Sequence, residues 1–448
     1  MTENFFLTGN FAPVADESTA QDLRVTGTIP EALEGRLLRI GPNPVAPDPA
    51  NYHWFLGNGM VHGVALRGGR ALWYRSRFVR DDEVVAAKGW PPVAGPQREF
   101  ALSGGIANTH VISHAGKTFA IVEGGNLPVE LSRDLETIAR SDFGGTLPAG
   151  FSAHPKRDPD TGELHVAVYG VGAEHIQYVV VGADGRVRKT VEVLVPGSPM
   201  VHDCAITKNY FLLLDLPVVL DRSGLESGTG GSLPYTWQPE YGARVGLLPR
   251  DGGADDVIWR ELSPCFVFHP LNAFEDADGR VVLDVIRHPQ TFASARYQAG
   301  NGPPTLDRWT IDPHGGPVKE ERLDDRPQEF PRCDERRIGK PHRYGYSIEV
   351  GAGFRFESLL KHDLRDGRTE RHVERPDRLF MEPVFVPRAP DAAEDDGWLL
   401  AYTYDGDTNR SGVVILEAQD FSAEPIATIE LPTRVPFGFH GSWIPDRS

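Results

Sequence analysis

Residues 278–286 read Asp-Gly-Arg-Val-Val-Leu-Asp-Val-Ile, and this stretch contains the two signals that decide the fold class. Residues 281–286 are a short run of β-branched and large apolar side chains, which is typical of a β-strand. The Asp278-Gly279 pair in front of it tolerates the positive φ angles of the tight turns that join antiparallel strands. Together they predict a strand that is entered through a hairpin turn.

The same two signals recur along most of the chain. Further strand runs lie at residues 177–181 (QYVVV), 210–214 (YFLLL) and 412–416 (GVVIL). Asp-Gly pairs recur at residues 184–185, 251–252, 366–367, 396–397 and 405–406. No long helical block separates these hairpins, so the pattern predicts an all-β protein. It favours a β-propeller, in which four-stranded blades surround a central channel.

The predicted blades are irregular, because the sequence contains no repeat of fixed length. Three stretches rich in Gly, Pro, Ser or Ala are predicted to be long excursions between strands: residues 84–105, 221–238 and 288–305. Such loops can gather on one face and cover the mouth of the channel. No domain boundary is visible, so residues 1–448 are predicted to form a single propeller domain.

The composition argues against several classes of function. The formal net charge is −17, and an acidic surface repels phosphate backbones, which argues against a nucleic-acid partner. The sequence shows no signal peptide and no apolar stretch long enough to span a membrane. Cys204, Cys265 and Cys333 lack a disulfide or zinc-site spacing, which favours free thiols. These features predict a cytoplasmic protein.

Four of the fifteen histidines lie at the ends of short apolar or aromatic stretches. They are His154 in FSAHP, His202 in PMVHDC, His269 in FVFHPLNA and His440 in FGFHGSW. A residue before proline favours extended geometry, so these side chains are expected near strand ends, where separate blades converge on the channel axis. Neutral imidazole is a ligand for Zn, Cu, Fe and Ni. Each histidine alone is more typical of a hydrogen-bonded core residue than of a metal ligand, and the spacing matches no local metal motif.

Other titratable side chains divide into two groups. Three glutamates in apolar surroundings are candidates to orient metal-bound imidazoles, as buried carboxylates commonly do: Glu123, Glu329 and Glu382. The alternative for each glutamate is a strand edge or a turn that faces water. Five histidines among polar or turn residues are predicted to be solvated: His114, His314, His342, His362 and His372.

Three further segments carry a family resemblance. They are residues 35–44 (GRLLRIGPNP), 54–63 (WFLGNGMVHG) and 439–443 (FHGSW). Through these segments, together with the histidine and glutamate segments, the chain resembles the carotenoid cleavage oxygenase family along nearly its whole length. The resemblance implies a seven-bladed β-propeller with Fe(II) on its axis and a cap of loops and helices over one face. It also implies that O₂ cleaves an alkene into two carbonyl products.

The resemblance also assigns roles to residues. It implies that His154, His202, His269 and His440 bind the iron, and that Glu123, Glu329 and Glu382 orient three of them, which leaves His154 without a glutamate. It implies a structural role for His62, which lies in a motif of the family but is not a ligand there. No organic cofactor is implied.

Two features bear on the substrate. Bacterial stilbene-cleaving members carry a lysine immediately before the first of these glutamates, whereas this chain has Val122, which favours an apocarotenoid-like alkene. Carotenoid-cleaving relatives often carry an apolar insertion that dips into the membrane, whereas residues 219–234 are short and polar, which argues against membrane docking. The alternatives are a stilbene or vinyl-phenol substrate, a retinoid-ester isomerase or hydrolase, and a propeller that serves as a binding scaffold. The oligomeric state stays open.

Overall fold

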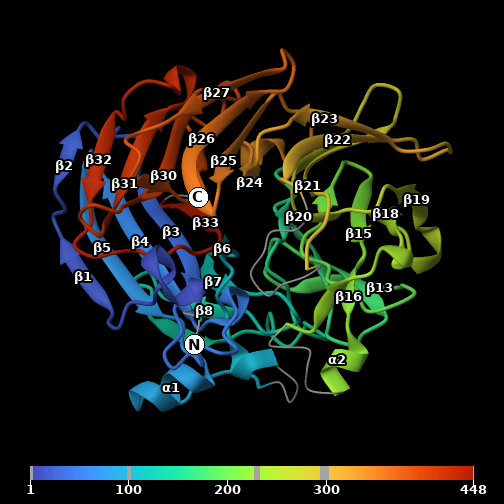
Figure 1. The fold of residues 1–448 in the computed structure, drawn as a ribbon, viewed down its shortest axis with the longest axis horizontal. Helices are drawn as coiled ribbons and strands as arrows, with labels where there is room; N and C mark the ends of the chain where they lie inside the picture. Colours follow the sequence, from blue (N-terminus) through green and yellow to red (C-terminus); the bar gives the residue numbers. More distant parts are fainter. Residues whose placement is uncertain (1–3, 98–101, 227–232, 293–301, 447–448) are drawn as a thin grey trace.

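Seven sheets of four or more strands stand around a central axis as the blades of a β-propeller (Figure 1). The computed structural model describes residues 4–97, 102–226, 233–292 and 302–446. Within these ranges the α-helices are short: α1 (Asp82–Lys88) and α2 (Arg222–Glu226). The 3₁₀ turns are η1 (Phe5–Leu7), η2 (Gly9–Phe11), η3 (Trp54–Leu56), η4 (Leu102–Gly105), η5 (Pro239–Tyr241), η6 (Ala254–Asp256), η7 (Glu335–Arg337) and η8 (Ala418–Asp420).

Five blades consist of consecutive chain segments. Their strands are β6 (His110–His114), β7 (Lys117–Ile121), β8 (Val129–Leu131) and β9 (Thr137–Arg140); β10 (Lys156–Arg157), β11 (Leu164–Val168), β12 (His175–Val181) and β13 (Val187–Leu194); β14 (Ala205–Ile206), β15 (Tyr210–Asp215), β18 (Ala243–Pro249) and β19 (Ile258–Leu262); β20 (Phe266–Glu275), β21 (Val281–His288), β22 (Thr305–Ile311) and β23 (Lys319–Asp324); β24 (Gln328–Arg332), β25 (Tyr344–Gly351), β26 (Arg355–Asp363) and β27 (Arg368–His372). A separate ribbon pairs β16 (Val218–Leu220) with β17 (Tyr235–Trp237).

The other two blades close the ring, because each combines segments from both ends of the chain. One sheet has the order β1 (Ser18–Gln21), β5 (Arg70–Phe78), β4 (Gly59–Arg67), β3 (Gly35–Pro42) and β33 (Gly441–Pro445). The other has the order β2 (Val25–Gly27), β32 (Ala427–Glu430), β31 (Arg410–Glu417), β30 (Gly397–Asp405) and β28 (Arg378–Phe380), and β29 (Val384–Pro387) also pairs with β30. In Figure 1 the blue β2 accordingly lies beside the red β32.

The middle strands of the blades form the core. Every residue of β3 is buried, and so are six of the seven residues of β12. Such strands are covered on both faces by neighbouring blades, so they are continuous apolar runs rather than alternating ones. All four predicted strand runs lie in middle strands of this kind, β12, β15, β21 and β31, and are confirmed. Outer strands alternate instead, as β13 does between half-buried and exposed residues.

The predicted excursions contain some regular structure. Residues 84–105 include the end of α1 and η4, and residues 221–238 include α2 and β17. Parts of these predicted excursions, at residues 98–101, 227–232 and 293–301, lie outside the described residues. The three cysteines are free and buried. In the described part of the chain, no helix is both long and apolar enough to cross a membrane.

The prediction of solvated histidines is wrong for four of five. His314 is exposed, but His114, His362 and His372 are each 3% exposed or less, and the His342 side chain is fully buried. Their polar neighbours suggested water, yet these rings are buried in the packed interior of the blades. Two of them make polar contacts there: Nε2 of His114 hydrogen-bonds the carbonyl of Gly182 at 2.8 Å, and His342 lies 3.3 Å from Asp284.

Candidate metal centre

Four histidines come from the edges of four blades that meet on the axis. Edge strands of neighbouring blades contact one another in three pairs: β14 with β20, β20 with β24, and β33 with β6. His154, His202 and His440 lie just before β10, β14 and β33, near strand ends as expected. His269 differs because it lies inside β20, and Pro270 continues the strand. The pairing of β20 with β21 is interrupted between Val267 and Pro270, and such a bulge accepts a proline.

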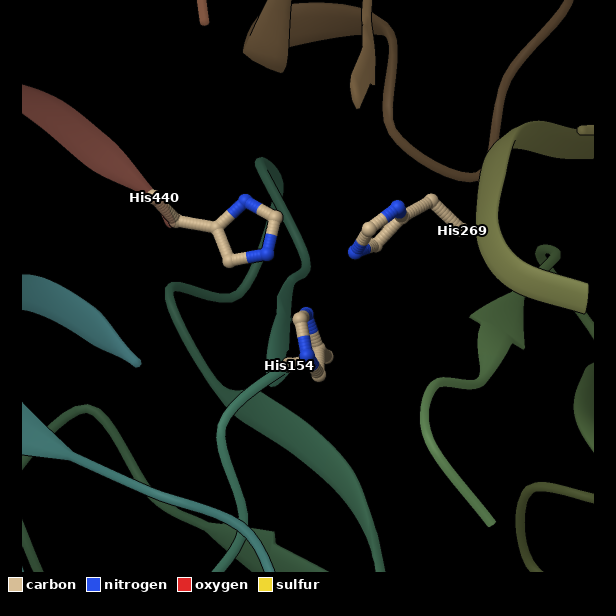
Figure 2. Close-up of side chains that lie close together, drawn as sticks. All are labelled: His154, His269 and His440. Carbon is tan, nitrogen blue, oxygen red and sulfur yellow. The ribbon is translucent and has the colours of Figure 1, made fainter. Parts of the chain in front are cut away.

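The four imidazoles converge on one buried point. Figure 2 shows the rings of His154, His269 and His440 facing one another, and a nitrogen from each lies within 4.8 Å of the other two. His202 completes the group, because its Nε2 is 3.3 Å from Nε2 of His269 and its ring centroid is 4.5 Å from that of His154. All four side chains are buried. The structure therefore brings together the four predicted ligands.

Each predicted glutamate lies against these histidines. Nδ1 of His269 donates to Oε2 of Glu329 at 2.6 Å, and Nδ1 of His440 donates to Oε1 of Glu382 at 2.7 Å. Nδ1 of His202 lies 2.9 Å from Oε2 of Glu123. At His269 and His440, Nδ1 carries the proton that faces the carboxylate, so Nε2 of the neutral ring keeps its lone pair. The carboxylates thus select the tautomer that a metal requires.

Two of the carboxylates are also fixed by the backbone. The Gly441 N–H donates to Oε2 of Glu382 at 2.8 Å, and the Arg332 guanidinium lies 3.3 Å from the same oxygen. The Phe330 N–H donates to Oε2 of Glu329 at 2.6 Å, in a left-handed conformation with φ of 54°. This conformation is unfavourable for a bulky residue. It stacks the Phe330 ring on the ring of His269, with 5.4 Å between the two ring centroids.

His154 has no carboxylate of its own. Its Nε2 is buried without a hydrogen-bond partner among the described residues, and Oε1 of Glu123 is 3.6 Å away. Its Nδ1 is 3.9 Å from Oδ2 of Asp203, which forms an ion pair with Lys156 at 2.8 Å. Glu123 therefore faces two rings, His202 closely and His154 at a longer distance.

Burial controls the charge of the centre. Burial, together with the charge of His202, lowers the pKa of His154 well below its usual value. Burial and the charge of His269 do the same to the pKa of His440. Burial alone would raise the pKa of Glu329, but the charge and hydrogen bond of His269 hold this pKa below its usual value. The pKa of His269 is instead raised, because the charge and hydrogen bond of Glu329 outweigh its burial. Neutral rings at His154 and His440 beside an ionised Glu329 are the protonation states that metal binding requires.

The residues present fit a divalent metal. Nε2 of His154 is a buried polar atom without a protein partner, and the Nε2 atoms of His202 and His269 face each other across 3.3 Å. Buried polar groups without partners are costly, and a cation that accepts these lone pairs removes that cost. An all-imidazole donor set suits iron, copper, nickel or zinc. The donor set alone does not choose between them.

A cavity of about 400 Å³ opens on the centre. It is lined by His202, His269 and His440 together with residues from loops and 3₁₀ turns on one face of the ring. Its wall is rich in aromatic side chains, including Trp54, Phe55, Phe268, Phe292, Phe330 and Phe439. A cavity of this size and composition takes a flat apolar molecule of moderate length.

The sequence did not identify His288 as part of this site. His288 lines the cavity, and its Nε2 hydrogen-bonds Oε1 of Glu329 at 2.7 Å. A usable signal was present, because His288 ends a strand and precedes Pro289, much as His269 precedes Pro270. The same neighbourhood contains Tyr169, whose hydroxyl donates to Oε2 of Glu123 at 3.4 Å.

Comparison with known proteins identifies the family. The family model described as retinal pigment epithelial membrane protein matches residues 11–445. A protein named carotenoid cleavage oxygenase, from Mycobacterium tuberculosis, is 44% identical over 99% of this chain and 98% of its own length.

Solved structures agree in fold. A lignostilbene dioxygenase from Pseudomonas brassicacearum superposes with a TM-score of 0.88 at 31% identity, over 98% of both chains. A cobalt-substituted apocarotenoid oxygenase from Synechocystis superposes with a TM-score of 0.84 at 30% identity, over 97% of both chains. The match of the family model and of these relatives along nearly the whole chain shows that this protein belongs to the carotenoid cleavage oxygenase family.

Proposed function

We propose that this chain is an iron(II)-dependent dioxygenase that cleaves a carbon–carbon double bond of an apocarotenoid-like conjugated alkene with O₂, giving two carbonyl products. The observation that carries the proposal is the convergence of four buried imidazoles, with three glutamates behind them, at the wall of an aromatic cavity. The names of relatives support the reaction class, and the cobalt-substituted relative supports a divalent metal.

In this proposal the side chains have separate tasks. His154, His202, His269 and His440 would hold the iron, which supplies the activation of O₂. Their neutral rings leave the full charge of the metal in place. Glu123, Glu329 and Glu382 would fix the rings. The aromatic wall excludes water and holds the alkene beside the centre, so catalysis depends on positioning rather than on an acid, a base or a nucleophile.

A stilbene or vinyl phenol is the second candidate substrate. Two observations favour it: the high structural similarity to a lignostilbene dioxygenase, and polar side chains such as Tyr169 and Thr291 in the cavity wall. Against it, Val122 lines the cavity and offers no charged partner for a phenol oxygen.

The test is an aerobic screen of iron-loaded protein against apocarotenals, hydroxystilbenes and vinyl phenols, with products identified by mass spectrometry. We expect about one iron per chain and two carbonyl products from an apocarotenal. Cleavage of stilbenes alone would move the function to the second candidate. Protein that binds no iron and cleaves nothing would overturn the proposal and leave the binding scaffold as the remaining reading.

A further inference from the structure

His288 connects the proposed iron site to the substrate cavity. It is the last residue of β21, its side chain lines the cavity, and it is 8% exposed. Its Nε2 hydrogen-bonds Oε1 of Glu329, the carboxylate whose Oε2 accepts from Nδ1 of His269. One carboxylate therefore separates the His288 ring from a proposed iron ligand.

This contact fixes the tautomer of His288. An ionised carboxylate only accepts hydrogen bonds, so the proton lies on Nε2, between the ring and Glu329. In the neutral ring Nδ1 then carries a lone pair and acts as an acceptor. Among the residues that the structure describes, no group hydrogen-bonds Nδ1 of His288. Because His288 lines the cavity, a bound ligand can supply a donor to this acceptor.

The surroundings define the ligand that fits. The Phe268 ring meets His288 edge-on at a centroid distance of 4.9 Å, and Phe292 lies in the same wall. Thr291, also buried, adds a hydroxyl to this part of the cavity. A matching ligand is flat and apolar, and it carries one hydrogen-bond donor at the end that meets His288.

We propose that Nδ1 of His288 accepts a hydrogen bond from a hydroxyl group of the substrate, so that the protein selects hydroxylated alkenes over the corresponding molecules without the O–H. This inference rests on the proposed function and narrows its substrate class. The hydroxyl can belong to a phenol or to the hydroxylated ring of an apocarotenoid, since both present the same donor. His288 is then a specificity-determining residue.

The test uses equilibrium binding under anaerobic conditions to the iron-loaded protein. The phenol arm compares 4-hydroxybibenzyl with 4-methoxybibenzyl, which lack a cleavable double bond. The terpenoid arm compares 3-hydroxy-β-ionone with β-ionone. In the arm that matches the natural substrate, we expect the wild type to bind the hydroxylated member about tenfold more tightly, which corresponds to one satisfied hydrogen bond.

Three variants make the test specific. His288→Phe should reduce this ratio to about one, whereas His288→Gln should keep most of it, because an amide can donate to Glu329 and accept from the ligand. His53→Phe is the matched control and should keep the ratio, since Nδ1 of His53, which also lines the cavity, already accepts from the Phe55 N–H at 3.2 Å.

Several results would overturn the assignment. One is equal binding of both members of each pair by the wild-type protein. This measurement does not depend on whether any variant folds. Another is a His288→Phe variant that keeps the ratio or loses affinity equally for both members, as expected of a purely structural residue. Because binding is measured without turnover, the binding ratio can be interpreted even if the protein cleaves no alkene. A protein that cleaves alkenes without discrimination refutes only the role of His288.

Discussion

The two halves of the metal centre are built differently. In the anchored half, which comprises His269, His440, Glu329 and Glu382, each histidine has its own carboxylate at 2.6 or 2.7 Å. A backbone N–H fixes each of these carboxylates. In the shared half, which comprises His154, His202 and Glu123, one carboxylate faces two rings at 3.6 and 2.9 Å.

The supporting backbone differs in the same way. His269 lies within the ten-residue β20, and the carbonyl and amide of His440 bond Ile40 and Thr109. His154 and His202 instead precede β10 and β14, which are only two residues long. Ring orientation is therefore fixed by strand pairing and dedicated carboxylates in one half, and by a shared carboxylate and loop packing in the other. We infer that the anchored half contributes more to metal affinity.

The largest effect is expected from removing a ligand. Replacing His269 or His440 with Ala should weaken iron binding by more than about 100-fold, beyond the usual cost of losing only an orienting carboxylate, and should abolish cleavage. His154→Ala should also abolish cleavage but retain more iron. Iron per chain, measured by mass spectrometry after dialysis at graded free iron, checks this order. The exposed His314→Ala is the control, and full iron content in all three ligand variants would contradict the proposed centre.

An intermediate effect is expected from the carboxylates of the anchored half. Glu329→Gln and Glu382→Gln should each bind iron, or turn over substrate, roughly 10- to 100-fold less well, because the amide no longer fixes the ring as an ionised acceptor does. Circular dichroism should show unchanged folding. If both variants kept wild-type iron affinity and kinetics, these carboxylates would have no part in the site.

The smallest effect is expected from the shared half. Glu123→Gln should weaken iron binding by less than about tenfold, below the usual range for such a carboxylate, because its contacts are longer and divided between two rings. The same iron titration measures it beside Glu329→Gln. Equal losses in the two variants would show that the two halves do not differ in function.

The sequence predicted the fold from its middle strands, which bury both faces and are therefore visible as apolar runs. It missed β1 and β2, because these short edge strands are partly exposed and polar. Their partners could not be seen either. β2 pairs with β32 near the other end of the chain, and nothing in a local pattern specifies a partner so far away in sequence.

The same limit applies to the site. The candidate ligands and glutamates were found from their apolar settings and the family resemblance, and the structure brings all of them together. His288 was missed because its importance depends on a contact with Glu329 from the next blade. His114 and His342 were misjudged because polar neighbours in sequence do not report which side chains the fold covers.

The double closure of the ring has a consequence for biosynthesis. His440 directly precedes β33, the strand that pairs with β3, so the segment that completes one blade also delivers a proposed ligand. A nascent chain grows from its N-terminus at about 5–20 residues per second, so His154, His202 and His269 leave the ribosome before His440 is available. The four-histidine centre therefore cannot form until the last of its four segments has been made. Selection of a metal by all four histidines therefore comes late in synthesis, after the other three proposed ligands have been made.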